Sequence, residues 1–219
     1  MATKLVWDQV GQKIYETGVS NGVLYVADSE AESGYADGVA WNGLVSITES
    51  PSGAEATAIY ADNIKYLSLM SAEEFGCSIE AYTYPTEFEA CDGSASLGEG
   101  VTIGQQPRKK FALVYKTLVG NDVEGQAHGY KLHIVYGCSA APSERAYGSV
   151  NDSPEAITFS WEITTDPVPV AGHNPTSIIT IDSTKVDAST LATIEGKLFG
   201  GASEGPTVMT PDEVIAALA

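Results

Sequence analysis

Basic residues are scarce in this sequence. Its 219 residues include 11 lysines and arginines against 29 aspartates and glutamates, which gives a formal net charge of −18. Proteins hold nucleic acid through basic side chains that displace counterions from phosphates, so a chain this acidic is repelled by DNA and RNA. We therefore predict no specific nucleic-acid binding, although DNA can pass beside such a protein.

Long apolar runs and paired cysteines are also missing. Runs such as residues 112–114 and 134–136 fall far short of the roughly 20 apolar residues of a membrane-spanning helix, and residues 1–20 lack the apolar core of a secretion signal. Cys77, Cys91 and Cys138 form no Cys-x-x-Cys motif and cannot all pair. These absences predict a protein without membrane insertion that is made in a reducing cytoplasm and keeps its thiols free and buried.

No pattern typical of a catalytic or cofactor site occurs. His128 and His133 share neither one helical face nor a known zinc spacing. There is no Gly-x-Ser-x-Gly turn and no glycine-rich phosphate loop. Adjacent acids such as Glu73 and Glu74 arise by chance in so acidic a chain and do not single out a glycosidase pair. The sequence predicts no enzyme activity, no metal and no cofactor.

What the sequence does contain is a series of β-branched and aromatic runs separated by turn residues. These runs predict strands at residues 4–10, 14–17, 22–27, 39–49, 54–61, 76–84, 110–119, 130–136, 156–164 and 177–181. Asn21-Gly22 predicts a type I′ hairpin turn, and residues 120–129 predict a polar loop between two strands. Within residues 156–164 apolar and polar side chains alternate, as in a strand with one buried face. The chain is predicted to be mainly β.

Helices are few. Residues 187–199 have apolar side chains at helical spacing with Gly200-Gly201 behind them, so we predict a helix that covers one sheet face. A shorter helix fits residues 85–91. The sequence from Thr210 to Glu213 is a helix start with a capping box, but the tail that follows is too short to be stable without docking. We predict one mainly β domain at residues 1–205 and a C-terminal arm with a short helix at 206–219.

Several stretches resemble one protein family. They are GNDVEGQAHGYKLHIVYGCSAAPSERAY at residues 120–147, NDSPEAITFSWE at 151–162, YADN at 60–63 and PVPV at 167–170. Together they resemble the major tail protein, or tail tube protein, of bacteriophages with long, non-contractile tails. The resemblance extends over residues 4–199 and is most specific between 107 and 170.

The resemblance implies a fold and a function. The fold is a two-sheet β-sandwich or barrel with one flanking helix, a long inter-subunit loop and terminal arms. The function is structural: copies form hexameric rings that stack into a tube around a tape-measure protein, join other tail-end proteins, and later conduct the genome. Such a subunit is assembled in the cytoplasm of the bacterial host and resides in the virion tail. An acidic bore suits this role, because it repels the DNA that moves through it.

The resemblance and the charge distribution together suggest interface residues. Residues 49–63 resemble the long loop between subunits and rings, and Arg108, Lys109 and Lys110 form the one basic cluster that can offset repulsion between acidic copies. Charge reversal of all three is expected to abolish tubes and leave the monomer folded. The residues expected at contacts between subunits or rings are Pro51, Tyr60, Asp62, Asn63, Arg108, Lys109, Lys110 and Pro211. Glu80 and Glu162, on the polar faces of their strands, are candidates for the bore.

Two other readings remain open. One is a β-sandwich module for binding or adhesion without catalysis, which needs an exposed aromatic platform; Trp7, Trp41 and Trp161 are far apart in the sequence. The other is a glycosidase built on two acids, which the sequence does not favour above chance. Electron microscopy separates these readings from a tail tube, since only the tube subunit forms rings.

Overall fold

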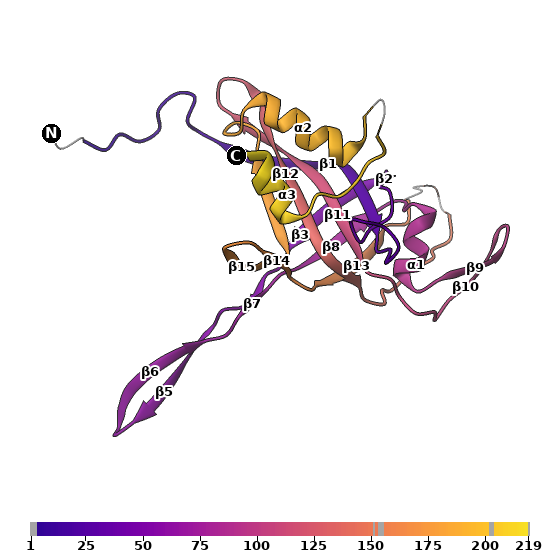
Figure 1. Ribbon diagram of the computed structural model, residues 1–219, viewed down its shortest axis with the longest axis horizontal. Coiled ribbons are helices and arrows are strands. Elements are labelled where there is room, and N and C mark those ends of the chain that lie inside the picture. Colours follow the sequence, from indigo (N-terminus) through magenta and orange to yellow (C-terminus); the bar gives the residue numbers. More distant parts are fainter. Residues whose placement is uncertain (1–3, 151, 153–155, 202–203, 219) are drawn as a thin grey trace.

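The computed structural model describes residues 4–150, 152, 156–201 and 204–218, and the chain is mainly β (Figure 1). Residues 151 and 153–155 of the tail-protein motif lie outside the described residues. The main antiparallel sheet contains β1 (Tyr15–Val26), β2 (Val39–Trp41), β3 (Leu44–Glu49), β8 (Gly76–Ala81), β11 (Phe111–Asn121), β12 (Gly125–Ala140), β13 (Phe159–Thr165) and β16 (Ile178–Asp182). Their order is β2-β1-β11-β12-β13-β8-β3, and β16 pairs with the first part of β12.

Four smaller hairpins and the helices complete the chain. The hairpins pair β4 (Ser52–Gly53) with β7 (Glu73–Glu74), β5 (Ala56–Ala61) with β6 (Ile64–Met70), β9 (Ala95–Gly98) with β10 (Val101–Ile103), and β14 (Val168–Val170) with β15 (His173–Thr176). The helices are the 3-10 turn η1 (Thr86–Phe88), α1 (Glu89–Asp92), α2 (Ala188–Phe199) and α3 (Pro211–Leu218).

The first core lies between the two halves of the main sheet. Strands β8 and β13 pack their apolar faces, with η1 and α1, against β1, β2, β11 and β12. Its centre is aromatic: the rings of Trp41 and Phe88 lie 4.6 Å apart, and those of Trp41 and Trp161 lie 5.8 Å apart. Tilted and edge-on contacts of this kind add to the gain from burying such large side chains.

The second core lies on the opposite face of β1, β11 and β12. Helix α2 covers this face with Leu191, Ile194 and Leu198, and Val208 and Met209 extend the cover towards α3. Strand β11 is therefore buried on both faces, which explains its uninterrupted apolar run. The expected fold, a β-sandwich with a flanking helix, is confirmed.

Two sequence predictions about the first half of the chain are wrong. Residues 4–10 form no strand and are exposed, because none of the described strands pairs with them. Asn21-Gly22 makes no hairpin: β1 runs through it, and its two ends pair in turn with β11 across register shifts. Asn21 has φ 53°, and this positive φ supports a bulge instead of a turn.

A second Asn-Gly pair, Asn42-Gly43, interrupts the strand predicted at residues 39–49. The sequence predicts one strand, whereas the structure divides it into β2 and β3 at Asn42-Gly43, where Gly43 has φ 77°. Strand β2 pairs with β1, and β3 pairs with β8, so the chain crosses from one half of the sheet to the other here. A glycine permits the left-handed conformation that the crossing needs.

The helices predicted at residues 187–199 and after Thr210 are confirmed as α2 and α3, and so is the shorter helix around residues 85–91. The Asp187 carboxylate accepts hydrogen bonds from the backbone N–H groups of Ser189 and Thr190 at the start of α2. In α3, Thr210 Oγ1 accepts from the Glu213 N–H, and the Glu213 carboxylate accepts from the Thr210 N–H at 2.8 Å. The capping box is therefore formed, and α3 packs on the body of its own chain through Val214.

Candidate assembly surfaces

A long hairpin leaves the sandwich between β3 and β8 (Figure 1). The β4–β7 pair forms its stem and the β5–β6 pair forms a blade that projects away from the body; we call residues 52–74 the projecting hairpin. Asp62 and Asn63 form its tip, with φ values of 50° and 64°, as in a type I′ turn. The structure thus brings Tyr60, Asp62 and Asn63 together at the tip and leaves Pro51 at the base.

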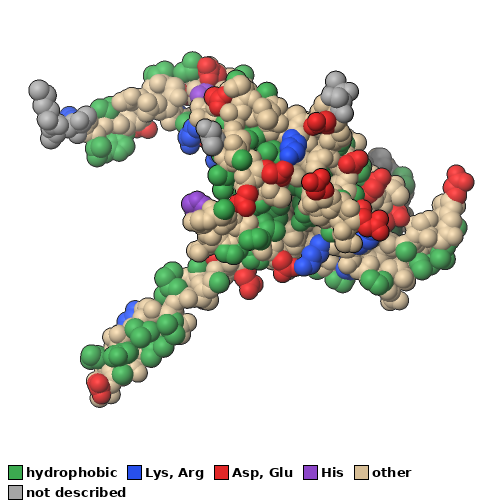
Figure 2. Space-filling model, viewed as in Figure 1, with side chains coloured by type: hydrophobic (Ala, Val, Ile, Leu, Met, Phe, Trp, Pro, Cys, Tyr) green, Lys and Arg blue, Asp and Glu red, His purple; other side chains and the backbone are tan. Residues whose placement is uncertain are grey.

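The blade is nearly uncharged, and apolar side chains cover much of the face that Figure 2 shows. Side chains alternate along a strand, so Leu67 and Leu69 lie on one face of β6 and Met70 on the other, and all three are exposed. Large apolar side chains therefore stand on both faces of the blade. Asp62 and Lys65 are its two charged residues. The large apolar side chains exposed on the blade are Ile59, Tyr60, Ile64, Tyr66, Leu67, Leu69 and Met70. A two-stranded ribbon is marginally stable in water, and an apolar surface of this kind is typical of an interaction site.

A partly buried polar cluster, in which Tyr115 and His133 are buried and Glu49 is exposed, lies at the root of the hairpin. Glu49, the last residue of β3, accepts a hydrogen bond from the Tyr115 hydroxyl at 2.8 Å. The His133 ring stacks on Tyr115 with centroids 4.6 Å apart, and its Nδ1 lies 3.5 Å from Glu49 Oε1. Burial lowers the pKa of His133 below its ordinary 6.5, so the imidazole is neutral at pH 7.

The basic cluster lies elsewhere and is used within the chain. Arg108 donates to the Ala140 carbonyl at 2.9 Å and approaches Asp92 at 3.8 Å. Lys110 pairs with Asp166 at 2.5 Å on the surface. Lys109 has an exposed side chain, and its backbone N–H donates to the Ala90 carbonyl. None of the three lies on the projecting hairpin.

Asp92 anchors the chain around the basic cluster. Its side chain is 10% exposed and accepts from the Arg145 guanidinium and, at 3.2 Å, from the Trp161 indole. Arg145 in turn lies over the Tyr84 and Phe159 rings, which ties the coil after β12 to the aromatic core. Arg108 therefore belongs to the polar network around Asp92, in addition to carrying a charge near the surface.

Glu80 and Glu162 share the outer face of the β3-β8-β13 half of the sheet. Glu80 lies opposite Ser160, and Glu162 opposite Ser78, so the two carboxylates are diagonal neighbours on one face. Ser46 on β3 donates to Glu80 at 2.9 Å. The strands of this half contain no lysine or arginine. The face is consequently small, polar and negative, and its place in a bore stays a prediction.

The C-terminal segment forms an apolar cleft on the opposite side of the sheet. Pro211, expected at a subunit contact, is buried at the start of α3 and lines this cleft. The cleft has a volume of about 320 Å³ and its rim carries Asp212. We call it the α3 cleft; its apolar lining consists of Tyr35, Val168, Pro169, Val208, Met209 and Pro211.

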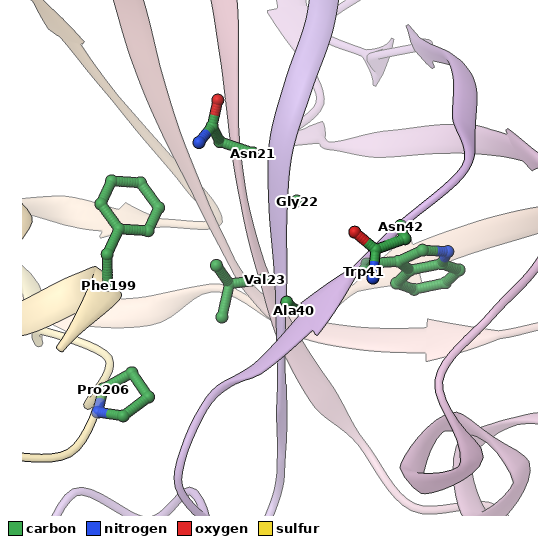
Figure 3. Close-up of a pocket in the computed structure, with 8 residues that line it drawn as sticks. All are labelled: Asn21, Gly22, Val23, Ala40, Trp41, Asn42, Phe199 and Pro206. Atoms are coloured by element: carbon green, nitrogen blue, oxygen red, sulfur yellow. The ribbon is translucent and has the colours of Figure 1, made fainter.

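A second pocket, of about 390 Å³, opens between the end of α2 and the end of β2 (Figure 3). Phe199 and Pro206 form one wall, opposite Val23 and Ala40, while the Trp41 ring points away into the first core. Gly22 lies on its floor, where a Cβ atom would come within 2.4 Å of Leu44. The two asparagines at its edge are uncharged, so the pocket offers no anchor for a charged ligand.

Residues 4–10, which we call the N-terminal arm, form a further exposed apolar segment. The Trp7 side chain is 73% exposed, and Leu5, Val6 and Val10 are also mostly exposed. In Figure 1 the arm extends away from the body. The apolar residues of the arm predicted a strand in the sequence analysis. The structure shows that no other part of the described chain covers them.

The three cysteines are buried and free. Burial raises the pKa of the Cys77 and Cys91 thiols to about 12, and that of Cys138 well above its ordinary value, so all three are protonated. His128 is 2.6 Å from Glu124 in a surface turn. Within the described ranges, no three histidines, cysteines or acids are grouped so as to hold a metal ion. No described helix has the length and apolar character needed to span a bilayer.

The fold and surfaces define a class: a β-sandwich with a flanking helix and two exposed apolar extensions, the projecting hairpin and the N-terminal arm. No protein-family model and no curated protein matches the sequence. Among solved structures, one similar chain belongs to the cryo-EM structure of the anti-feeding prophage (AFP) baseplate, 6-fold symmetrised. It is 8% identical over 85% of this chain and 100% of that chain, with a TM-score of 0.35. A similarity this low transfers neither details of the fold nor a function.

Proposed function

We propose that this chain is a structural virion protein that assembles with copies of itself into stacked, hexameric rings and so forms the tail tube of a long-tailed phage. It would meet the tape-measure and tail-end proteins there and line a conduit for the genome. The observation that carries the proposal is the projecting hairpin, whose apolar residues on both faces have no partner within the described chain. The resemblance of residues 107–170 to tail tube proteins points the same way.

The distribution of charge supports assembly through this hairpin. Acidic copies repel one another over a Debye length of about 8 Å in physiological salt. The blade between residues 56 and 70 carries one aspartate and one lysine, so it can approach another copy without that penalty. Burying its apolar side chains contributes about 25 cal/mol per Å². The negative face of Glu80 and Glu162 is then free to face the bore.

Electron microscopy of the concentrated chain tests the proposal. We expect rings or tubes from the natural sequence and none from the triple variant Tyr60→Ser, Tyr66→Ser, Met70→Ser, because it removes one apolar face of the blade. The matched control is Leu97→Ser with Val101→Ser on the β9–β10 hairpin, where both side chains are comparably exposed; it should assemble normally.

Three results would contradict the proposal. Tubes from the triple blade variant would show that the hairpin does not mediate assembly. Dispersed monomers of the natural sequence at every concentration, with a hairpin that proteases cut freely, would favour the binding module. Assembled tubes in which Glu80 and Glu162 point away from the axis would remove these two residues from the bore.

A further inference from the structure

The root of the N-terminal arm is fixed to the sheet at one known point. The Gly11 N–H donates to Asp122 Oδ1 at 2.9 Å, and the Lys13 N–H approaches the same oxygen at 3.4 Å. The Asn121 side chain donates to the Gly11 carbonyl at 3.5 Å. Asn121 is the last residue of β11 and Asp122 follows it in the turn, so the arm is anchored at the tip of the β11–β12 hairpin.

The α3 cleft lies near the other end of the same strands. Tyr136 lines the cleft and donates its hydroxyl hydrogen to the Met209 carbonyl at 2.8 Å. On β12 it lies beside Val135, which pairs with Leu113 near the start of β11. From Ala112 to Asn121 a strand advances about 30 Å at about 3.3 Å per residue. Trp7 is four residues from Gly11 and reaches at most about 14 Å. The arm therefore cannot place Trp7 in the α3 cleft of its own chain.

The arm and the cleft are complementary in polarity. The arm carries apolar side chains at Leu5, Val6, Trp7 and Val10, and the cleft floor is apolar. A neighbouring pocket of about 420 Å³ shares Ser33, Val208 and Thr210 with the cleft and adds Glu32, so the groove is long enough for an extended segment.

The charges are complementary as well. Residues 4–13 carry Lys4 and Lys13 against Asp8, which makes them a basic stretch in a chain of net charge −18. The groove is edged by Glu32 and Asp212, and neither forms an ion pair with any described lysine or arginine. Glu213 beside them is already paired with Lys197 at 2.5 Å. Asp212 accepts a hydrogen bond from the Ala171 N–H at 2.9 Å. Lys4 can thus approach two carboxylates at the groove that no described lysine or arginine pairs with.

We infer that the α3 cleft of one copy binds the N-terminal arm of a second copy, with Trp7 in the apolar floor and Lys4 against the acidic rim. This inference rests on the proposed self-assembly and names a second interface for it. The arm exchanges between copies because its anchor at Asp122 keeps it too far from its own cleft. Pro211 then serves the interface as part of the wall that receives the arm.

Photo-crosslinking from position 7 tests the inference. Full-length protein with Trp7→benzoylphenylalanine is mixed as ¹⁴N and ¹⁵N copies, irradiated, and mapped by mass spectrometry. We expect cross-links from position 7 to Tyr35, Pro169 or Met209 that join light and heavy chains. Glu32→Lys should lower their yield, and Lys4→Glu in the arm together with Glu32→Lys should restore it. Leu97→benzoylphenylalanine, an equally exposed probe on the β9–β10 hairpin, is the control and should not reach the cleft.

The outcomes separate this inference from the proposed function. Cross-links within one copy, or to surfaces other than the cleft, overturn the inference even when rings are seen. Arm-to-cleft cross-links between copies without rings or tubes support the inference and contradict the tube. Absence of any cross-link between copies in a chain that stays monomeric overturns both.

Discussion

Tyr115 donates its hydroxyl hydrogen to Glu49, and this one bond ties the root of the projecting hairpin to the central strand β11. Tyr115 is buried in the first core, whereas Glu49 is the last residue before the chain leaves the sandwich. The bond therefore links a rigid element to a surface that is exposed to solvent in the single chain. The bond thus adds to the pairing of β3 with β8, which also fixes the root of the hairpin.

Removing the Tyr115 hydroxyl should weaken the root of the hairpin. We expect Tyr115→Phe to lower the free energy of unfolding by about 1 kcal/mol, since one hydrogen bond to a carboxylate is lost and the ring still packs. Urea unfolding measures the loss, and proteolysis at residues 50–76 should become faster. Tyr82→Phe, an exposed tyrosine at the end of β8, is the control and should change neither. An unchanged midpoint for Tyr115→Phe would contradict the role of the bond.

His133 should make stability depend on pH. Its pKa in the folded chain lies below 6.5 because burial disfavours the imidazolium, although Glu49 opposes this in part. Between that lowered pKa and 6.5 the unfolded chain binds more protons, so stability falls as the pH decreases through this range. Urea midpoints between pH 8 and pH 5 should fall more steeply for the natural sequence than for His133→Gln. Parallel curves would show that His133 does not contribute.

Asp92 should be important for the fold. Asp92→Ala leaves Arg145 and the Trp161 indole without their acceptor, so we expect the free energy of unfolding to fall by about 2 kcal/mol. This is less than the loss expected for a fully buried pair, because Arg108 and Arg145 are both partly exposed. Asp92→Asn keeps an oxygen for the indole and should lose less. Urea unfolding followed by tryptophan fluorescence measures both variants, and equal losses would argue against the charge of Asp92.

Charge reversal should affect stability differently at Arg108, Lys109 and Lys110. Lys109→Glu and Lys110→Glu should leave the unfolding midpoint nearly unchanged, since exposed pairs contribute little. Arg108→Glu places a carboxylate beside Asp92 and should lower the midpoint, so the triple reversal is unsuitable as a test of assembly. The double variant of Lys109 and Lys110 is expected to reduce tube formation in electron micrographs. Normal tubes from it would remove the basic cluster from the interface.

The capping box should hold α3 in place. Thr210→Ala removes the acceptor for the Glu213 N–H and should cost about 1 kcal/mol. Because α3 lies at the edge of the second core, the loss should appear as faster amide hydrogen exchange at residues 207–218 before global unfolding changes. Thr193→Ala in α2, whose hydroxyl bonds only within its own exposed turn, is the control. Equal exchange in α3 for both variants would contradict the prediction.

The sequence by itself determined the mainly β character of the chain, the positions of most core strands and the two capped helices, because these depend on local periodicity and on short-range capping. The sandwich was expected only from the resemblance to tail tube proteins. The predicted alternation holds within β13, where Trp161 and Ile163 are buried and Glu162 is exposed, but Ile157 lies before the strand and is exposed. The type of turn was not determined locally. Asn21-Gly22 and Asn42-Gly43 share the same two residues, yet the first lies in a bulge and the second divides two strands.

Only the tertiary structure decided which apolar residues are left uncovered. The runs at residues 4–10 and 56–70 resemble core strands in sequence, and the Asp62-Asn63 turn signal was present but did not show that the hairpin would leave the body. Whether an apolar strand is buried depends on the strand that pairs with it, which is set by contacts far apart in the chain. The same long-range packing turned Arg108 inward to Asp92 and brought Pro211 beside Tyr35, relations for which no local pattern exists.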